Sequence, residues 1–403
     1  MDIRGFSRPA AAFDFQKLLI TLSPMIWKFP GCLLFAAALT VNTQTATPQI
    51  ASGRSEKIQA ISPATHPLPP ESESWEVTQF SFIVYGDTRG RRDGKEIQYE
   101  HSMVVDSMIE NIRKRDTTLF PIRFIMQTGD AVVDGGDARQ WNKSFVGLIN
   151  RLTTEGGLPY FLAPGNHDVT DARALTSTNR QQGLRNYLAA VGNLIPPDGA
   201  PRRLDGYPCF AFGYGNSFFI ALDSNIAFDK TQLKWLVGQL EALDRERYPN
   251  VFTFFHHPVF SSGPHGGSTV EAPTSELRKR FMPLFRKHHV TAIFAGHEHL
   301  FEHWVERYQD KAGHDFRIDQ VVTGGGGAPL YGHSGEPNLA DYVKAGKPEK
   351  VQVKHLVRPG PRSGDTPYHY VIVQVDGNQI RLEVIGVDWG KDFRPYQSRK
   401  MEF

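Results

Sequence analysis

Cysteine is nearly absent from this sequence: two occur among 403 residues, Cys32 and Cys209. Cys32 falls in an N-terminal segment that we expect to be separate from the folded body, so the body would keep one thiol and cannot form an intramolecular disulfide. A small disulfide-stabilised domain is therefore excluded. The hydrophobic fraction of 40% indicates instead a core large enough to be stable without such bonds. Cys209 has apolar neighbours, and we interpret it as a small core residue.

An excess of charge of one sign is also lacking. Lys and Arg number 45 and Asp and Glu 43, and the first 46 residues hold four of the basic and two of the acidic residues. The rest of the chain is balanced, so we expect no basic field that would attract nucleic acid and no nucleic-acid partner. The sequence of residues 76–403 contains no internal repeat and no break in composition, and we predict that it forms one domain.

No apolar run is long enough for an uninterrupted membrane span, but the N-terminal segment has the features of an export signal. Residues 31–41 have the length of the hydrophobic region of a signal peptide, and Lys28 and Pro30 interrupt any longer helix. We predict that residues 1–46 are a signal peptide and that the protein is periplasmic or secreted; an uncleaved N-terminal membrane anchor is the alternative. Residues 47–75 are rich in Ser, Thr, Pro and Glu and are predicted to be a disordered linker.

Apolar runs and amphipathic segments alternate in the body of the chain. Strands are predicted at residues 79–85, 119–126 and 158–164, with helices at about 96–113 and 138–152 between them. This β-α-β-α-β order predicts an α/β domain with parallel strand pairing.

The second half of the body shows the same alternation and ends in a hairpin. A polar insertion is predicted at residues 170–205, and a glycine-rich stretch opens a predicted loop at residues 324–367. A hairpin is predicted at residues 368–386, because Asp376-Gly377-Asn378 separates two apolar runs. The other predicted strands are at residues 207–214, 217–222, 251–255, 290–294, 300–305 and 317–322, and the other predicted helices are at residues 181–191, 228–243 and 274–287.

Five of the predicted strands end in polar side chains that can bind metal ions. In open α/β sheets, ligands bind outside the carboxyl ends of the strands. His297 and His299 are two residues apart on an extended segment, so both imidazoles face the same side. Each of these polar residues taken alone could have a purely structural role; an aspartate that follows glycine, for example, is common in turns. Two carboxylates, an amide and three imidazoles in series, however, suit a pair of divalent or trivalent metal ions. The six candidate ligands are Asp87, Asp130, Asn166, His256, His297 and His299.

In their order, the motifs around these residues resemble those of the calcineurin-like metallophosphoesterases, the superfamily that includes the purple acid phosphatases. The motifs are Gly86-Asp87-Thr88-Arg89, Gly129-Asp130, Gly165-Asn166-His167-Asp168, His256-His257-Pro258 and Gly296-His297-Glu298-His299. The resemblance covers residues 82–299, and residues 324–329 are similar to a further family segment. It implies a four-layer α/β/β/α sandwich with two mixed sheets and a dimetal site at the carboxyl ends of the strands. It also implies an exported, metal-dependent phosphoric-ester hydrolase.

The resemblance further implies which residue binds which ion. The implied ligands are Asp87 and His299 for the first ion, Asp130 as the bridge between both ions, and Asn166, His256 and His297 for the second ion. His257 would be a neighbour of the site and not a ligand. The ions would be Fe, Zn or Mn, and a hydroxide that bridges them would attack phosphorus in line.

Other residues would act on the substrate. His167 would hydrogen-bond the phosphoryl group or protonate the leaving oxygen, and Asp168 would orient His167. His265 resembles a substrate-side histidine of plant purple acid phosphatases, with a mobile surface loop as the alternative. Further candidates for the pocket lining are His314, Tyr331 and His333.

The sequence departs from the family pattern at Arg89. Most relatives have a histidine ligand there, and purple acid phosphatases supply a tyrosine where Val133 stands. The first ion would then have three protein ligands and water, and we predict that it binds more weakly and gives no tyrosinate-to-iron purple colour. Arg89 is always charged and cannot be a ligand. We predict that it clamps the substrate phosphate, and a salt bridge to a nearby carboxylate is the alternative.

The predicted function is the hydrolysis of a small phosphate ester, with a phosphomonoester as the favoured substrate. A phosphodiesterase acting on a cyclic nucleotide or a phospholipid headgroup is the alternative, followed by a non-catalytic phosphate-binding relative. We expect residues 170–205 and 324–367 to select the substrate, because loops carry specificity. A membrane would be a partner only through an uncleaved N-terminal segment, and the sequence leaves the oligomeric state open.

Overall fold

The computed structural model of the chain describes residues 56–170, 174–388 and 391–396. The predicted signal peptide, residues 1–46, lies outside the described residues, as do residues 47–55 of the predicted linker. Among the residues that the structure describes, no helix is long and apolar enough to cross a membrane.

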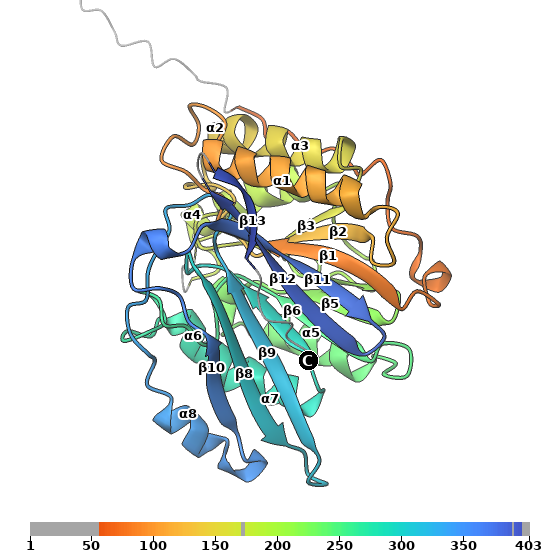
Figure 1. Ribbon diagram of the computed structural model, residues 1–403, viewed down its shortest axis with the longest axis vertical. Helices are drawn as coiled ribbons and strands as arrows, with labels where there is room; N and C mark the ends of the chain where they lie inside the picture. Colours follow the sequence, from red (N-terminus) through yellow and green to blue (C-terminus); the bar gives the residue numbers. More distant parts are fainter. Residues whose placement is uncertain (1–55, 171–173, 389–390, 397–403) are drawn as a thin grey trace, which may run out of the picture. The chain divides into compact units, whose positions relative to one another are not determined.

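Within the described residues, two mixed β-sheets form the centre of the fold (Figure 1). The first has six strands in the order β13-β12-β11-β1-β2-β3. β1 pairs in parallel with β2, and β2 with β3, whereas β11, β12 and β13 join by antiparallel pairing. The strands are β1 Gln79–Tyr85, β2 Ile122–Gln127, β3 Tyr160–Leu162, β11 Tyr368–Asp376, β12 Gln379–Asp388 and β13 Lys391–Tyr396.

The second sheet has seven strands in the order β10-β8-β9-β7-β6-β5-β4. Its centre is parallel, from β5 through β6 and β7 to β9, and antiparallel strands flank this centre on both sides. The strands are β4 Phe210–Tyr214, β5 Ser217–Ala221, β6 Asn250–Phe254, β7 Ala292–Ala295, β8 Phe301–Gln309, β9 Asp315–Thr323 and β10 Gln352–Val357. The predicted parallel pairing is therefore confirmed at β1, β2 and β3, which form one side of the first sheet, and the second sheet has a parallel centre.

Helices cover the outer face of each sheet, so the layers run helix, sheet, sheet, helix (Figure 1). α1, α3 and α4 bury apolar side chains against the first sheet, and α5 and α7 bury theirs against the second. The helix predicted at residues 138–152 contains a π-helical turn, Trp141–Val146, between α2 and α3. The helices are α1 Tyr99–Arg115, α2 Ala138–Gln140, α3 Gly147–Thr154, α4 Thr178–Val191, α5 Lys230–Glu241, α6 Ala272–Glu276, α7 Met282–Lys287 and α8 Ala340–Ala345.

Phenylalanine rings fill the space between the two sheets. Phe82 of β1 stacks on Phe124 of β2 at a ring distance of 5.2 Å, and the edge of Phe219 of β5 meets Phe82 at 5.2 Å. Phe252 of β6 lies 5.4 Å from Phe82. Because consecutive strand residues point to opposite faces, the alternate residues of β1 and β2 supply this layer while their neighbours pack under the helices.

Residues 56–75, the described part of the predicted disordered linker, pack against the rest of the protein. Ile61 is fully buried, and its N–H donates to the carbonyl oxygen of Ala190. The carboxylate of Glu71 accepts a hydrogen bond from the N–H of Gly213. The prediction of disorder was therefore wrong for residues 56–75, because a few well-placed contacts anchor a segment whose average composition is polar.

The prediction that residues 324–367 form a loop was also wrong in part, since this segment contains α8 and β10. β10 is an edge strand that pairs with β8, and its side chains alternate between exposed and half-buried positions. Such a strand has a weak apolar signal because only one face contacts the protein. The predicted C-terminal hairpin at residues 368–386 is present as β11 and β12.

Candidate metal centre

The predicted metal ligands lie together at one edge of the two sheets. Asp87, Asp130 and Asn166 follow β1, β2 and β3, and His256 and His297 follow β6 and β7. Parallel strands have their carboxyl ends at the same edge, and the packing of the sheets brings the two edges together. Asp87, Asp130 and His256 each offer a ligand atom within 4.8 Å of the others.

Three of these residues have a left-handed backbone conformation that is uncommon outside glycine. The φ angles are 60° at Asp87, 56° at Asp130 and 70° at His297. Hydrogen bonds hold this geometry: the N–H of Asp87 donates to the carbonyl of Gly129, and the N–H of His297 donates to the carboxylate of Asp87. Backbone strain of this kind persists where the surrounding structure fixes it, and it gathers at functional sites.

The atoms predicted to bind the second ion surround Nε2 of His256. Oδ1 of Asn166 is 2.8 Å from this nitrogen, Nδ1 of His297 is 3.1 Å away and Oδ1 of Asp130 is 3.4 Å away. Nδ1 of His256 donates to the carbonyl of Thr128, and Nε2 of His297 faces Oε2 of Glu271 at 3.0 Å. Nε2 of His256 therefore carries a lone pair and faces Nδ1 of His297, and either a proton on Nδ1 or a metal ion can join the two nitrogens.

The charges of these groups also fit a bound cation. Burial lowers the pKa of His256 to about 3 and that of His299 to about 4, so both imidazoles are neutral near neutral pH, the form that coordinates a metal. Burial and the neighbouring Asp130 raise the pKa of Asp87 well above its usual value, because two buried carboxylates repel each other. Positive charge between the carboxylates relieves that repulsion.

Arg89 lies among the residues predicted to bind the first ion. Its Nε is 3.0 Å from Oδ2 of Asp130, so the salt bridge that the sequence left as an alternative is present. Nη2 of Arg89 is 3.4 Å from Nε2 of His299, and the same Nε2 is 3.4 Å from Oδ1 of Asp87. Positive charge from Arg89 thus reaches both predicted ligands of the first ion.

His167 and Asp168 both lie at the site, but the predicted contact between their side chains is not present. Nδ1 of His167 donates to the carbonyl oxygen of Val133 at 2.6 Å. The carboxylate of Asp168 accepts hydrogen bonds from the N–H groups of Gly165 and Ala131, both at 2.9 Å. The prediction that the side chain of Asp168 orients the ring of His167 was wrong: Asp168 fixes the two loops, and a backbone carbonyl orients the ring.

His265 belongs to an ordered loop at the site. Its ring centroid is 4.7 Å from that of His297. Buried Glu298 accepts a hydrogen bond from the N–H of His265 at 2.7 Å, and its other carboxylate oxygen is 3.3 Å from Nδ1 of the ring. This hydrogen bond raises the pKa of His265.

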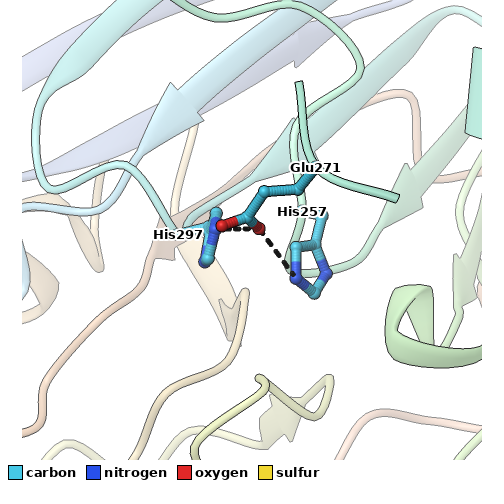
Figure 2. A group of neighbouring side chains, drawn as sticks. All are labelled: His257, Glu271 and His297. Carbon is cyan, nitrogen blue, oxygen red and sulfur yellow. Dashed lines mark hydrogen bonds and ion pairs between the residues drawn. The ribbon is translucent and has the colours of Figure 1, made fainter. Parts of the chain in front are cut away.

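Glu271, which sequence reasoning missed, lies between two histidines of the site. Figure 2 shows its carboxylate reaching His297 on one side and His257 on the other, with Oε2 at 3.0 Å and 4.0 Å from their Nε2 atoms. Nδ1 of the buried His257 ring is 2.9 Å from the hydroxyl of Ser224. His257, Glu271 and His297 form a second group that could hold a metal ion, so the role of His257 as a neighbour and not a ligand stays a prediction. Glu271 directly precedes α6, where an acidic residue is ordinarily a helix-start residue, and this hid its second role.

The three further candidates for the pocket lining differ in position. Tyr331 stacks on His299, with ring centroids 4.2 Å apart, and is part of the site. His314 is an exposed residue of the β8–β9 turn and pairs with Asp310. His333 pairs with Glu336.

A polar pocket of about 420 Å³ opens beside His167. The predicted insertion supplies one of its walls through Asn179, Gln182 and Gly183 of α4, which supports the expectation that residues 170–205 select the substrate. The remaining lining residues are Val133, Asp134, Gly136, Asn166, Asp168 and Thr170.

Sequence comparison connects this geometry to a known family. The family model described as calcineurin-like phosphoesterase matches residues 82–301. Over 208 residues, or 51% of this chain, the sequence is 31% identical to probable purple acid phosphatase 20 of Arabidopsis thaliana, of which 44% is covered. Over 102 residues it is 37% identical to tartrate-resistant acid phosphatase type 5 of Sus scrofa, with 25% of each chain covered. The chain thus spans less than half the length of these curated relatives.

A solved structure shares the fold. The purple acid phosphatase PPD1 from yellow lupin (Lupinus luteus) seeds aligns with a TM-score of 0.56 and 18% sequence identity, over 81% of this chain and 54% of that chain. At this identity the likeness concerns the fold alone. It agrees with the predicted sandwich of two mixed sheets between layers of helices.

Proposed function

The chain belongs to the calcineurin-like phosphoesterase family, and we propose that it is a metal-dependent hydrolase of phosphoric esters. One observation carries this proposal: Nε2 of His256 lies 2.8 Å from Oδ1 of Asn166, 3.1 Å from Nδ1 of His297 and 3.4 Å from Oδ1 of Asp130, so four atoms that can coordinate a metal ion converge at one place. Imidazole nitrogens with carboxylate and amide oxygens suit Zn, Fe or Mn.

Asp130, Asn166, His256 and His297 would hold a divalent ion, which would polarise a phosphoryl oxygen and make water a better nucleophile. The residues of the chain then bind the substrate and handle the proton. Nδ1 of His167 donates to Val133, so its Nε2 is left for the phosphoryl group or, when protonated, for the leaving oxygen. The hydrogen bond that His265 donates to Glu298 favours the protonated form of His265, which can bind a phosphate oxygen.

We further propose a phosphomonoester as the substrate and export of the protein. The relatives with the matched sequences are named as acid phosphatases, which supports the monoester. Export rests on the sequence of residues 1–46. A phosphodiesterase is the second candidate, because the pocket of about 420 Å³ beside His167 has room for a second ester group.

An assay of the purified protein on a chromogenic phosphomonoester and the matching diester tests the function. Each is measured with Fe, Zn and Mn, and after chelation, between about pH 5 and 9. We expect faster turnover of the monoester and loss of turnover on chelation. Faster turnover of the diester would reassign the substrate class, and no turnover of either ester with any metal would contradict the hydrolase proposal.

A further inference from the structure

The guanidinium of Arg89 lies where the first of two metal ions would be held. Its Nε is 3.0 Å from Oδ2 of Asp130, and Nη2 is 3.4 Å from Nε2 of His299. Nε2 of His299 is in turn 3.4 Å from Oδ1 of Asp87. Of the three side chains that the family resemblance assigns to the first ion, Asp130 and His299 contact the guanidinium directly and Asp87 lies behind His299; the side chain of Tyr331 also hydrogen-bonds Arg89.

The tautomer of His299 leaves a lone pair that the guanidinium of Arg89 can satisfy. Nδ1 of His299 is 2.7 Å from the carbonyl oxygen of Pro329, which can only accept, so Nδ1 carries the proton and Nε2 carries the lone pair. That lone pair faces a carboxylate oxygen of Asp87 at 3.4 Å. The guanidinium donates through Nη2 to His299 and through Nε to Asp130.

Arg89 is built into the site and is not a surface side chain folded inward. Its backbone N–H donates to the carbonyl of Asp130, and its carbonyl accepts from the side chain of Gln98. Its side chain is 19% exposed, whereas that of Arg92 on the same loop is 67% exposed and pairs with Glu96. The loop therefore presents one of its arginines to the site and another to solvent.

The group of residues predicted to bind the second ion does not need Arg89. Asn166, His256, His297 and Oδ1 of Asp130 converge, and Arg89 contacts the other oxygen of Asp130. Oδ1 of Asp130 is thus left for an ion, and Oδ2 binds the guanidinium. Asp130 keeps the bridging position that the resemblance assigns to it, but the guanidinium stands where one of the two metal ions would be. A second divalent ion would lie beside the guanidinium in a buried space, where like charges repel strongly.

We propose that the guanidinium of Arg89 permanently takes the place of the first metal ion, so that this protein binds one ion per site and not two. Asp130 bridges the ion and the guanidinium. The remaining N–H groups of Arg89 bind a phosphoryl oxygen and stabilise the charge that develops there, which the first ion does in a two-metal site. Only this role toward phosphate rests on the proposed function; the number of ions does not.

Metal content measured by plasma mass spectrometry tests the proposal. The purified full chain is incubated with excess Mn²⁺ or Zn²⁺ and desalted, and we expect about one ion per chain. Arg89→His removes the fixed charge and adds an imidazole, and we expect about two ions per chain. Arg92→His, on the same loop, is the matched control and should stay at about one. Two ions in the unaltered protein would overturn the proposal, as would a folded Arg89→His protein that stays at one.

The magnetic spectrum of the unaltered protein gives a second readout that needs no variant. Mn²⁺ bound alone gives the spectrum of an isolated ion, whereas two Mn²⁺ ions about 3.5–4 Å apart couple. We expect the isolated-ion spectrum at saturating Mn²⁺, and a coupled spectrum would contradict the proposal. The tests of the ion number and of the proposed function can fail independently. Turnover by a protein with two ions would contradict this inference alone, and one bound ion without turnover of any ester would contradict the proposed function alone.

Discussion

Backbone carbonyl groups set the tautomers of three histidines at the site. Nδ1 of His167, His256 and His299 lies 2.6, 3.0 and 2.7 Å from the carbonyl oxygens of residues 133, 128 and 329. Each carbonyl belongs to a different strand end from the histidine that it orients. A carbonyl only accepts, so every one of these rings is left with Nε2 for an ion or a substrate. The chemistry of the side chains therefore depends on the packing of several loops.

We predict that His167 acts on the substrate and not on the metal, and its removal tests that role. We expect His167→Ala to lower kcat by about 10²–10⁴-fold, the usual contribution of a general acid, and to leave the metal content unchanged. Turnover and metal content are measured on the same preparation. His314→Ala, at an exposed turn, is the control and should change neither. Loss of the metal from His167→Ala would make His167 a ligand.

Acid should destabilise the fold through histidines that are buried without a partner of opposite charge. Burial lowers the pKa of His101 from 6.5 to about 3, so the folded protein keeps this ring neutral while the unfolded chain binds a proton below pH 6.5. The contribution of His101 to stability is thus present above pH 6.5 and is lost as the pH falls from 6.5 toward 3, by up to about 1.4 kcal/mol per pH unit.

Urea unfolding at several pH values measures this effect. We expect the free energy of unfolding of His101→Phe to fall less between about pH 6.5 and 4 than that of the unaltered protein, because the variant has no proton to bind at this position. Equal losses in both proteins would show that His101 takes no part in the acid sensitivity.

The loop that carries His265 is held by two buried carboxylates. Glu298 accepts from the N–H of His265, and Glu302 accepts from the N–H of Ser262 at 2.8 Å. A Cβ at Gly263 would lie 2.3 Å from Oε2 of Glu298, so the loop and the carboxylate fit only with glycine there. The loop therefore holds His265 in place as one piece, since the two carboxylates that anchor it lie on the segment after β7 and on β8.

Gly263→Ala should therefore displace His265 without altering the histidine itself. We expect a lower kcat/KM for the phosphomonoester and an unchanged metal content, because none of the predicted ligands belongs to this loop. Gly238→Ala in α5 is the matched control, since a Cβ there meets nothing within 4 Å. Unchanged kinetics in Gly263→Ala would show that the loop position is not coupled to the reaction.

At the scale of the whole molecule, the phenylalanine layer between the sheets holds the two halves of the site together. The first sheet delivers Asp87, Asp130 and Asn166, and the second delivers the three histidines. Phe82 lies at the centre of this layer, fully buried and in ring contact with residues of both sheets. The distance between the two sets of ligands is therefore set by the packing of this core.

Phe82→Ala should lower the free energy of unfolding by about 3–5 kcal/mol, because it removes a buried ring and leaves a cavity. Denaturant unfolding followed by circular dichroism measures the change. Leu119→Ala is the control: Leu119 is 73% exposed, and we expect a change within about 0.5 kcal/mol. A small loss for Phe82→Ala would mean that the two sheets repack around the gap.

Sequence and tertiary structure contributed different parts of this description. The sequence by itself determined the α/β order, the strands that carry the site and the six predicted ligands, because period-two apolar runs and polar strand ends are local signals. It missed Glu271, the place of Glu298 and the order of residues 56–75, because each depends on contacts with residues distant in the chain.

Only the tertiary structure shows which residues Arg89 contacts. In the sequence its charge excluded it as a ligand but left open a phosphate clamp or a salt bridge. The fold brings it between Asp130 and His299, which the chain places 41 and 210 residues away, and so makes its guanidinium a fixed cation of the site. A charge is a property of one residue, but a binding site for that charge is a property of several elements packed together.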